Sequence, residues 1–332
     1  MALFKKKQKI EPVSEPETAP AVQFDENDND LFTFLKSDEF ASEHIAAPKY
    51  SYWGSVFRKF FSSKVAIISL IITLIIVLLA IFQPMFSGYD PMETPNINNK
   101  SMWFIRPCAQ YWFGTDSVGN SLFDVVWAGT RTSLFVAFMA TLITNSIGIV
   151  IGMIWGYSQK IDVVMLEIYN VISNIPTTLI AMILSNSLGG GMWQLIFALS
   201  ITGWIGMAYF IRVQVMIIRD REYNLASRCL GTPTGKIILN NVLPYLVSVI
   251  MTSLSRDIPA YIGYEVALSF LGVGLNQTYA SLGRMIQDYS SYMQSTPYIF
   301  WIPVAVSACI SISLYLVGQT LADASDPRTH MI

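Results

Sequence analysis

Six long runs of predominantly apolar residues constrain the fold of this chain more than any other feature of the sequence. A helix rises about 1.5 Å per residue, so about 20 apolar residues cross the hydrocarbon core of a bilayer. The first run, 65–82, is almost unbroken Ile, Leu and Val, and the others lie at 134–157, 163–188, 192–213, 245–271 and 298–321. We therefore predict an all-α integral membrane protein with six transmembrane helices.

The composition agrees with a membrane protein and argues against several other classes. Hydrophobic residues make up 53% of the 332 residues and charged residues only 13%, about half the charged share of a soluble domain. No nucleic-acid footprint is present. The cysteines Cys108, Cys229 and Cys309 predict neither a disulfide framework nor a metal site, because they lie far apart. His44 and His330 fall in the terminal tails, which argues against an intramembrane hydrolase.

The positive charges predict the orientation of the spans. Most of the 21 Lys and Arg residues fall on one side of the membrane if the N-terminus is inside. The opposite side then holds only Lys100, Arg106, Arg131 and Arg284, while Arg256 falls within a span. Because cytoplasmic loops collect Lys and Arg, both termini are expected in the cytoplasm.

The same pattern divides the chain into five parts. The first span lacks the small and polar residues that line helix–helix interfaces, so it is expected to be a peripheral, lipid-facing helix. A short helix is expected near 31–40 of the tail that precedes it. The parts are 1–64, a cytoplasmic tail with an acidic segment; 65–85, the peripheral helix; 86–132, an extracellular loop with an interfacial segment; 133–322, a core of five helices with a cytoplasmic loop at about 214–244; and 323–332, a cytoplasmic tail.

A polar segment, 221–245, lies between two apolar runs and predicts a helix, a sharp turn and a second helix. The first helix is expected from Glu222 to Leu230, and Gly231 suits its end because glycine accepts left-handed dihedrals. Pro244 is expected at the entry to the fifth span, where its missing N–H costs least. The residues alone leave two readings equally open: a docking site for a soluble partner, or an ordinary connector.

Five motifs along the chain, including this polar segment, resemble in type and order those of the C-type permease subunits of oligopeptide and dipeptide ABC importers. The polar segment resembles the EAA loop of these proteins in its spacing of Ala226, Ser227, Gly231, Val242, Leu243 and Pro244. It departs from the pattern at Leu225, where the family has an acid.

Four further stretches between residues 55 and 328 carry the same resemblance. They are F-G-T-D-S-V-G at 113–119 with A-G-T-R-T-S-L at 128–134, E-V-A-L-S-F-L-G-V-G at 265–274, the D-P-R ending at 326–328, and the positions of Asp162 and Pro176. Asp116 and Arg131, near the outer face, are expected to cap local structure, with contact to the binding protein as the alternative reading.

The resemblance implies a type I ABC importer permease in the plasma membrane of a prokaryote, a multi-pass subunit without catalytic activity. Its implied partners are a homologous second permease, two ATP-binding cassette ATPases, an extracellular peptide-binding lipoprotein and membrane lipid. This chain would bind no cofactor, and ATP and Mg would be bound by the ATPases. The residues expected to couple to the ATPases are Glu222, Ala226, Ser227, Arg228, Gly231, Leu243 and Pro244.

Charged residues inside the fifth span are candidates for contact with cargo. Arg256 lies about 18 Å along the helix from Pro244, near mid-membrane, where an arginine costs at least about 2.5 kcal/mol. We expect Arg256 and Asp257 to line the pathway, Arg256 meeting a cargo carboxylate and Asp257 an amine. An ion pair with the partner permease is the alternative of equal weight. Glu265 is a further pathway candidate, with a tether at the outer gate as its other reading.

In the third span, Asn174 and Pro176 are candidates for a kink used in gating, and a static kink is equally compatible with the sequence. Other readings of the whole chain also remain open. They are a permease of the same family for dipeptides or nickel, and an ion-coupled secondary transporter, for which an internal repeat would be expected.

Overall fold

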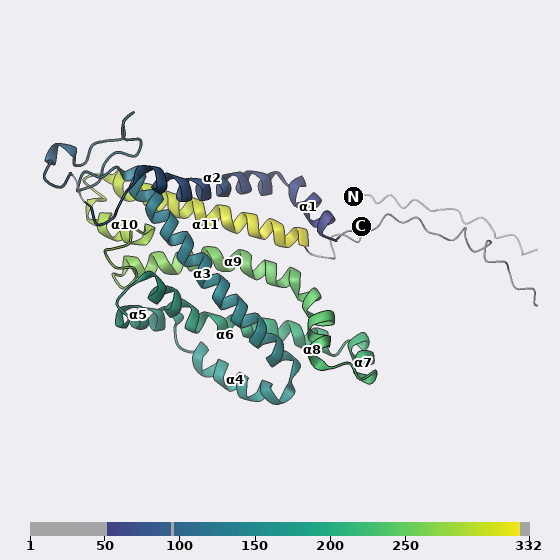
Figure 1. Ribbon diagram of the computed structural model, residues 1–332. Coiled ribbons are helices and arrows are strands. Elements are labelled where there is room, and N and C mark those ends of the chain that lie inside the picture. The colour runs from purple at the N-terminus through teal and green to yellow at the C-terminus, as the bar shows by residue number, and fades with distance from the viewer. Residues whose placement is uncertain (1–51, 94–95, 326–332) are drawn as a thin grey trace, which may run out of the picture. The chain divides into compact units, whose positions relative to one another are not determined.

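The computed structural model describes residues 52–93 and 96–325, and the regular secondary structure of this part is entirely helical (Figure 1). Helices long and apolar enough to cross a membrane are α2 (Lys64–Ser87), α3 (Leu122–Tyr157), α6 (Met192–Arg219), the segment that ends in α9 (Leu243–Phe270), and α11 (Pro297–Ser325). The predicted all-α membrane fold is thus confirmed for the described residues. The predicted helix near 31–40 lies outside them, as do residues 1–51 of the predicted N-terminal tail, with its acidic segment, and residues 326–332 of the predicted C-terminal tail.

A bent pair of helices occupies the place of the third span, which was predicted at 163–188 with a kink at Pro176. α4 (Gln159–Ser173) and α5 (Thr177–Ser187) meet at an angle of 75°, and together they make a sixth crossing if the pair counts as one span. The predicted kink at Pro176 is therefore confirmed, although the helix is broken there and not merely bent. Pro176 is the reason, because proline disfavours the helical conformation of the residue before it and has no N–H to donate.

α3 begins at Leu122, well before the predicted start of the second span. Leu122, Val125 and Val126 are all buried in the main apolar core, which extends the helix into the segment predicted as loop. Arg131, predicted in an extracellular loop, therefore lies on the exposed side of α3. The last part of the segment predicted as loop is thus helical, and its position outside the membrane stays a prediction.

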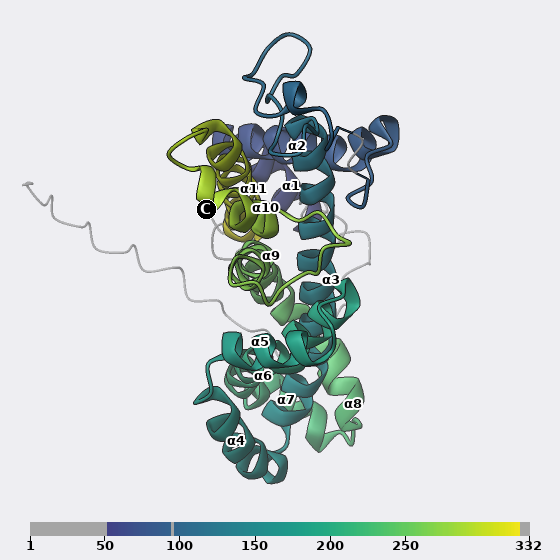
Figure 2. The same ribbon diagram turned by 90° about the vertical axis from the view of Figure 1, so that its left-hand side faces the viewer.

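The order of the helices is the same in two perpendicular views. α2, α11, α9, α6 and α4 follow one another, and α3 crosses them (Figures 1 and 2). α3 packs most extensively on α6. A Cβ atom on Gly152 would lie 2.5 Å from the Ala208 carbonyl oxygen, and one on Gly148 would lie 2.6 Å from the Met207 Cβ. These glycines allow the two backbones to approach closely, as small residues do in membrane interfaces.

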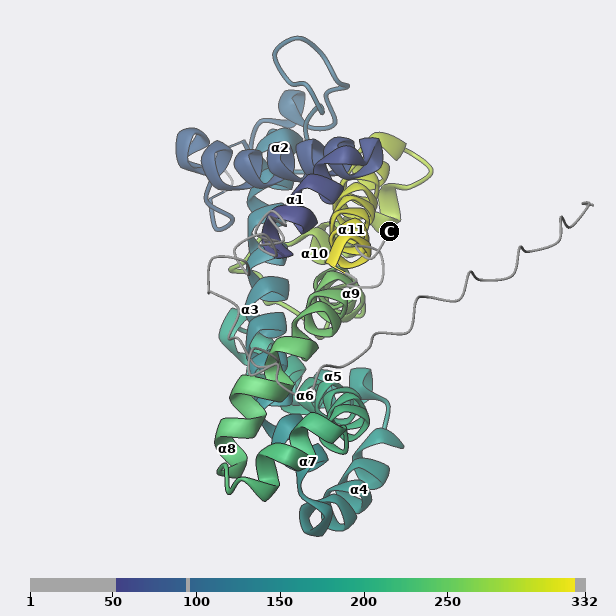
Figure 3. The ribbon, with the colours of Figure 1, turned by 90° about the vertical axis from the view of Figure 1, so that its right-hand side faces the viewer.

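The shorter helices gather at the two ends of the bundle. One end, called the α7 end here, carries α1 (Tyr52–Ser62), α7 (Glu222–Cys229), α8 (Thr234–Ile237) and the π-helical turn η3 (Ile238–Val242) (Figure 3). The other, called the α10 end, carries η2 (Lys100–Met102), α10 (Leu282–Tyr289) and η4 (Ser290–Tyr292).

Candidate functional site

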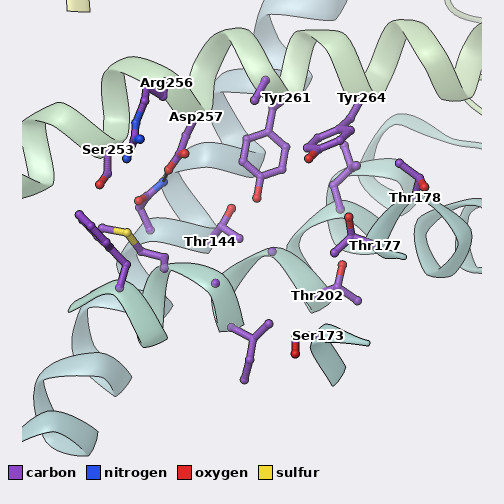
Figure 4. A pocket seen from close by; sticks show the side chains of 18 of the residues that line it. Thr144, Ser173, Thr177, Thr178, Thr202, Ser253, Arg256, Asp257, Tyr261 and Tyr264 are labelled. Atoms are coloured by element: carbon purple, nitrogen blue, oxygen red, sulfur yellow. Dashed lines mark hydrogen bonds between the residues drawn. The ribbon is translucent and has the colours of Figure 1, made fainter. Parts of the chain in front are cut away.

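A cavity of about 440 Å³ lies among α3, α4, α5, α6 and α9. Figure 4 shows the side chains that α9 contributes pointing toward the residues from α6 and from the α4–α5 break. The polar lining residues are Thr144, Asn145, Ser173, Thr177, Thr178, Thr202, Ser253, Arg256 and Asp257, joined by Tyr169, Tyr261 and Tyr264. Hydroxyl and amide groups therefore dominate the polar part of this surface.

Asp257 is tied to α3 through Asn145. The Asn145 amide Nδ2 donates to the Asp257 carboxylate at 2.9 Å and also to the Thr141 carbonyl at 3.0 Å. Both N–H groups of the amide are then used, whereas its oxygen has no partner among the described residues, and neither does the Ser253 hydroxyl. Buried polar atoms left in this way require a donor or acceptor from water or a ligand.

Arg256 lines the cavity beside Asp257, as predicted from the sequence, and both side chains extend from α9 toward the cavity (Figure 4). No salt bridge joins Arg256 to another described residue. A guanidinium in the middle of a span needs water or an acid. Arg256 is thus available to a partner that this chain does not supply within its described part.

Glu265 is placed elsewhere, although the sequence grouped it with Arg256 and Asp257. Its side chain is 0% exposed and does not line the cavity. Two hydroxyls donate to its carboxylate, Ser133 of α3 at 2.7 Å and Ser269 of α9 at 2.9 Å. The backbone N–H of Leu282 in α10 donates to Ser133 at 3.2 Å. Glu265 thus links α3, α9 and α10 through these hydrogen bonds. It lies at the α10 end, about 12 Å farther along α9 than Asp257.

The α4–α5 break places Ser173 and Thr177 in the cavity wall on either side of Asn174 and Pro176. Asn174 is the C-terminal cap of α4 and Pro176 is the N-terminal cap of α5. Both predicted kink residues therefore lie at the bend, next to the cavity rather than within its lining. The use of this bend in gating stays a prediction.

α7 and the turn after it confirm the local structure predicted for the polar segment. The helix runs from Glu222 to Cys229, Gly231 has a left-handed φ of 77°, and Pro244 lies in the first turn of α9 next to Leu243. Glu222 and Ala226 are exposed.

Two other predicted coupling residues, Ser227 and Arg228, form hydrogen bonds within the chain. Ser227 donates to the Tyr223 carbonyl at 2.9 Å and accepts from Asn241 at 3.3 Å. Arg228 donates to the Tyr157 hydroxyl at 3.0 Å. Two leucines are also exposed here, Leu225 of α7 at 45% and Leu230 after it at 84%.

The loop before α3 is organised around Asp116. Its carboxylate accepts the backbone N–H groups of Val118 and Asn120 and, from α10, the Tyr289 hydroxyl at 3.2 Å. This arrangement confirms the predicted local cap and adds a tertiary contact. Burial raises the pKa of the Asp116 carboxyl above its ordinary value, although the hydrogen bonds act against that rise.

Some residues of the site were not found from the sequence. Asn145 is an amide inside an apolar run, which is a usable signal, but its partner on α9 is more than one hundred residues away. Tyr169, Tyr261 and Tyr264 carry no sequence signal that separates them from aromatic packing residues. Among the described residues, no group of His, Cys, Asp and Glu is arranged to hold a metal ion.

Comparisons with known proteins cover nearly the whole chain. The family model of the binding-protein-dependent transport system inner membrane component matches residues 148–331, and that of the N-terminal TM domain of oligopeptide transport permease C matches residues 51–104. The chain is 52% identical to the oligopeptide transport system permease protein AmiD of Streptococcus pneumoniae, over 91% of this chain and 98% of the relative.

Two relatives from Bacillus subtilis are more distant. The oligopeptide transport system permease protein OppC is 33% identical over 86% of this chain and 93% of its own length. The dipeptide transport system permease protein DppC is 33% identical over 96% of this chain and 98% of its own length. The motif resemblance is thereby confirmed, and the chain belongs to the binding-protein-dependent transport system inner membrane components, the permease family of ABC importers.

Proposed function

We propose that this chain is the C-type permease subunit of an ATP-driven, binding-protein-dependent importer of oligopeptides. The observation that supports it most strongly is the 52% identity with the oligopeptide permease of S. pneumoniae along almost the entire chain. The cavity agrees with this cargo, because hydroxyl and amide side chains can exchange hydrogen bonds with the main chain of any peptide, whatever its side chains.

Arg256 and Asp257 supply opposite charges at one side of the cavity. Arg256, which has no salt bridge to a described residue, would attract a carboxylate of the passing peptide. Asp257, held by Asn145, would receive an amine. Weak contacts of this kind suit a pathway, since a cargo that binds tightly in the middle of the membrane leaves slowly.

The chain would form half of the pathway and a homologous second permease the other half. The apolar residues of α4 support this arrangement, because α4 has no buried residue and leaves Val163, Val164 and Val171 exposed. The bent pair counts as the sixth span in this proposal. Both termini then lie in the cytoplasm, with the α7 end on the cytoplasmic side and the α10 end facing an extracellular peptide-binding lipoprotein.

Two ATPase subunits would bind at the α7 end, where they would hydrolyse ATP with Mg. The exposed Leu225 and Leu230 support an apolar docking contact there, in place of the acid that the family carries at position 225. Glu222 and Ala226 on the exposed part of α7 would take part in this contact. Arg228 and Ser227 would instead hold α7 against the bundle.

The test is uptake of a labelled oligopeptide by proteoliposomes that contain the purified complex and the binding protein. Uptake in the wild type should require ATP, and Arg256→Ala should abolish it while the subunits still co-purify. Arg284→Ala is the matched control, because Arg284 pairs with Asp288 on α10, away from the cavity. Loss of assembly together with uptake in Arg256→Ala would assign Arg256 to the interface with the second permease. Uptake of dipeptides in preference to oligopeptides would correct the cargo.

A further inference from the structure

Trp155, Gly156 and Tyr157, three consecutive residues at the end of α3, form hydrogen bonds with side chains of α4, α6 and α7. On the α7 side, Arg228 donates to the Tyr157 hydroxyl at 3.0 Å, and its guanidinium lies 5.0 Å from the centre of the Tyr157 ring. Arg219, at the end of α6, donates to the Gly156 carbonyl at 3.0 Å. Arg228 also donates to the Arg219 carbonyl at 3.2 Å. α7 is therefore fastened to α3 and to α6 at the same point.

On the α4 side, the preceding residue of α3 continues the chain of contacts. The Trp155 indole N–H donates to the Asp162 carboxylate at 2.8 Å. Arg212 of α6 binds the same carboxylate through both of its oxygens, with Nη2 to Oδ2 at 2.9 Å. The Arg212 guanidinium lies 5.3 Å from the centre of the Trp155 ring and 5.5 Å from that of Tyr209. The Tyr209 ring in turn stacks on Tyr169 at 4.2 Å.

These contacts end at the cavity, because Tyr169 is one of its lining residues. α4 has no buried residue. Within the described part of the chain, Asp162 makes every side-chain hydrogen bond that joins α4 to another helix. The side of the cavity that α4 forms is called the α4 wall here. Its position depends on the Asp162 carboxylate, which Trp155 and Arg212 bind, and on the Tyr169–Tyr209 stack.

We propose that 155–157 is a relay that transmits displacement of α7 to the α4 wall of the cavity, with Arg212 and Asp162 as its positioning residues. The proposal rests on the proposed function, since ATPase docking is what would displace α7. Tyr157 and Gly156 take up the movement through Arg228 and Arg219. Because all three residues belong to one rigid helix end, Trp155 moves with them and carries Asp162 and the α4 wall.

Conservative replacements test the relay without large changes in side-chain size. Arg212→Lys keeps the cation but cannot form a two-pronged bond to Asp162 or stack between two rings. Asp162→Asn keeps the shape and removes the ion pair. Trp155→Phe keeps an aromatic side chain but loses the N–H donor and part of the buried indole volume. Arg284→Lys is the control, because it makes the same replacement in an ion pair at the α10 end.

The first measurement is peptide uptake per ATP hydrolysed, on reconstituted complexes whose subunits co-purify in wild-type amounts. We expect Arg212→Lys and Asp162→Asn to retain ATPase activity and to lower uptake per ATP about tenfold, within the usual range of coupling between sites. The control should keep the wild-type ratio. A wild-type ratio in both variants, or a loss of uptake explained entirely by lost assembly, would overturn the relay.

The second measurement is amide hydrogen exchange in the whole complex, with and without trapped ATP. In the wild type, peptides covering α7 and α4 should both change on trapping. In Arg212→Lys, the change in α7 should remain while that in α4 disappears, and an unchanged α4 response would contradict the relay. If ATP changes neither helix in the wild type, and uptake is independent of ATP, the proposed function itself fails.

Discussion

Asn145 of α3 donates a hydrogen bond to Asp257 of α9 at 2.9 Å, and this bond fixes a carboxylate in the wall of the cavity. The amide spends both N–H groups on the protein and leaves its oxygen without a partner among the described residues. A carboxyl group that accepts from a neutral amide has no ion pair to break before it meets a charged group of the cargo, in contrast to one paired with an arginine. The geometry of this pair therefore bears directly on what the cavity can attract.

The replacement Asn145→Leu should reduce peptide uptake and the stability of the complex, because Asp257 loses its donor. Hydrogen bonds to charged groups are worth about 1.5–3 kcal/mol. A double-mutant cycle with Asp257→Asn measures the pair, and the double variant should be no worse than the more damaging single variant. Additive losses in uptake would show that the two residues act separately.

The replacement Gly152→Ala should destabilise the protein by about 1–3 kcal/mol, the usual cost of overpacking. The added methyl would lie 2.5 Å from the Ala208 carbonyl oxygen and would separate α3 from α6. Gly263→Ala is the control on α9, because a methyl there meets no atom within 4 Å. Thermal unfolding in detergent compares the two variants, and equal melting temperatures would refute the close packing.

The replacement Glu265→Ala should lower thermal stability and loosen the α10 end. Two serine hydroxyls lose their acceptor, and each unsatisfied buried donor costs about 1–3 kcal/mol. Glu265→Gln retains one acceptor oxygen, so it should lose less stability than the alanine variant. A stable alanine variant with wild-type uptake would contradict the role of Glu265 in joining α3, α9 and α10.

The stability contributed by Asp116 should fall as the pH rises. Burial raises the pKa of this carboxyl, so the folded protein binds the proton more readily than the unfolded chain does. Stability present at acid pH is then lost as the pH rises through the folded-state pKa, and no further change follows above it. Melting temperatures from pH 4 to 7 should show this slope relative to Asp116→Asn. Parallel curves for the two proteins would contradict the prediction.

The sequence predicted those features whose causes are local. The apolar runs marked the long helices, while Gly231 and Pro244 marked the end of α7 and the start of α9. Pro176 signalled a kink but not its size, since the 75° bend depends on how α5 packs against α6. The early start of α3 was missed because burial of Leu122 and its neighbours against distant helices decides it.

Contacts between residues on different helices could not be predicted from the sequence. Arg256 and Asp257 could be placed in the cavity because charges inside a span are rare and costly. The partner of Asp162 could not, because Arg212 was indistinguishable from an arginine near the end of a span. Glu265 was left with two readings: its charge suggested the pathway, whereas its burial among three helices agrees with the alternative reading as a tether.

The central claim is that ATPase subunits bind at α7 and drive import through this chain. The most direct test is to purify the complex that contains Ala226→Trp, whose side chain projects from the exposed part of α7, and to assay ATP-dependent peptide uptake. We predict that the second permease still co-purifies, that the ATPases are lost and that uptake stops. A variant that keeps its ATPases and its uptake would contradict the claim, as would a wild-type protein that purifies alone and transports without ATP.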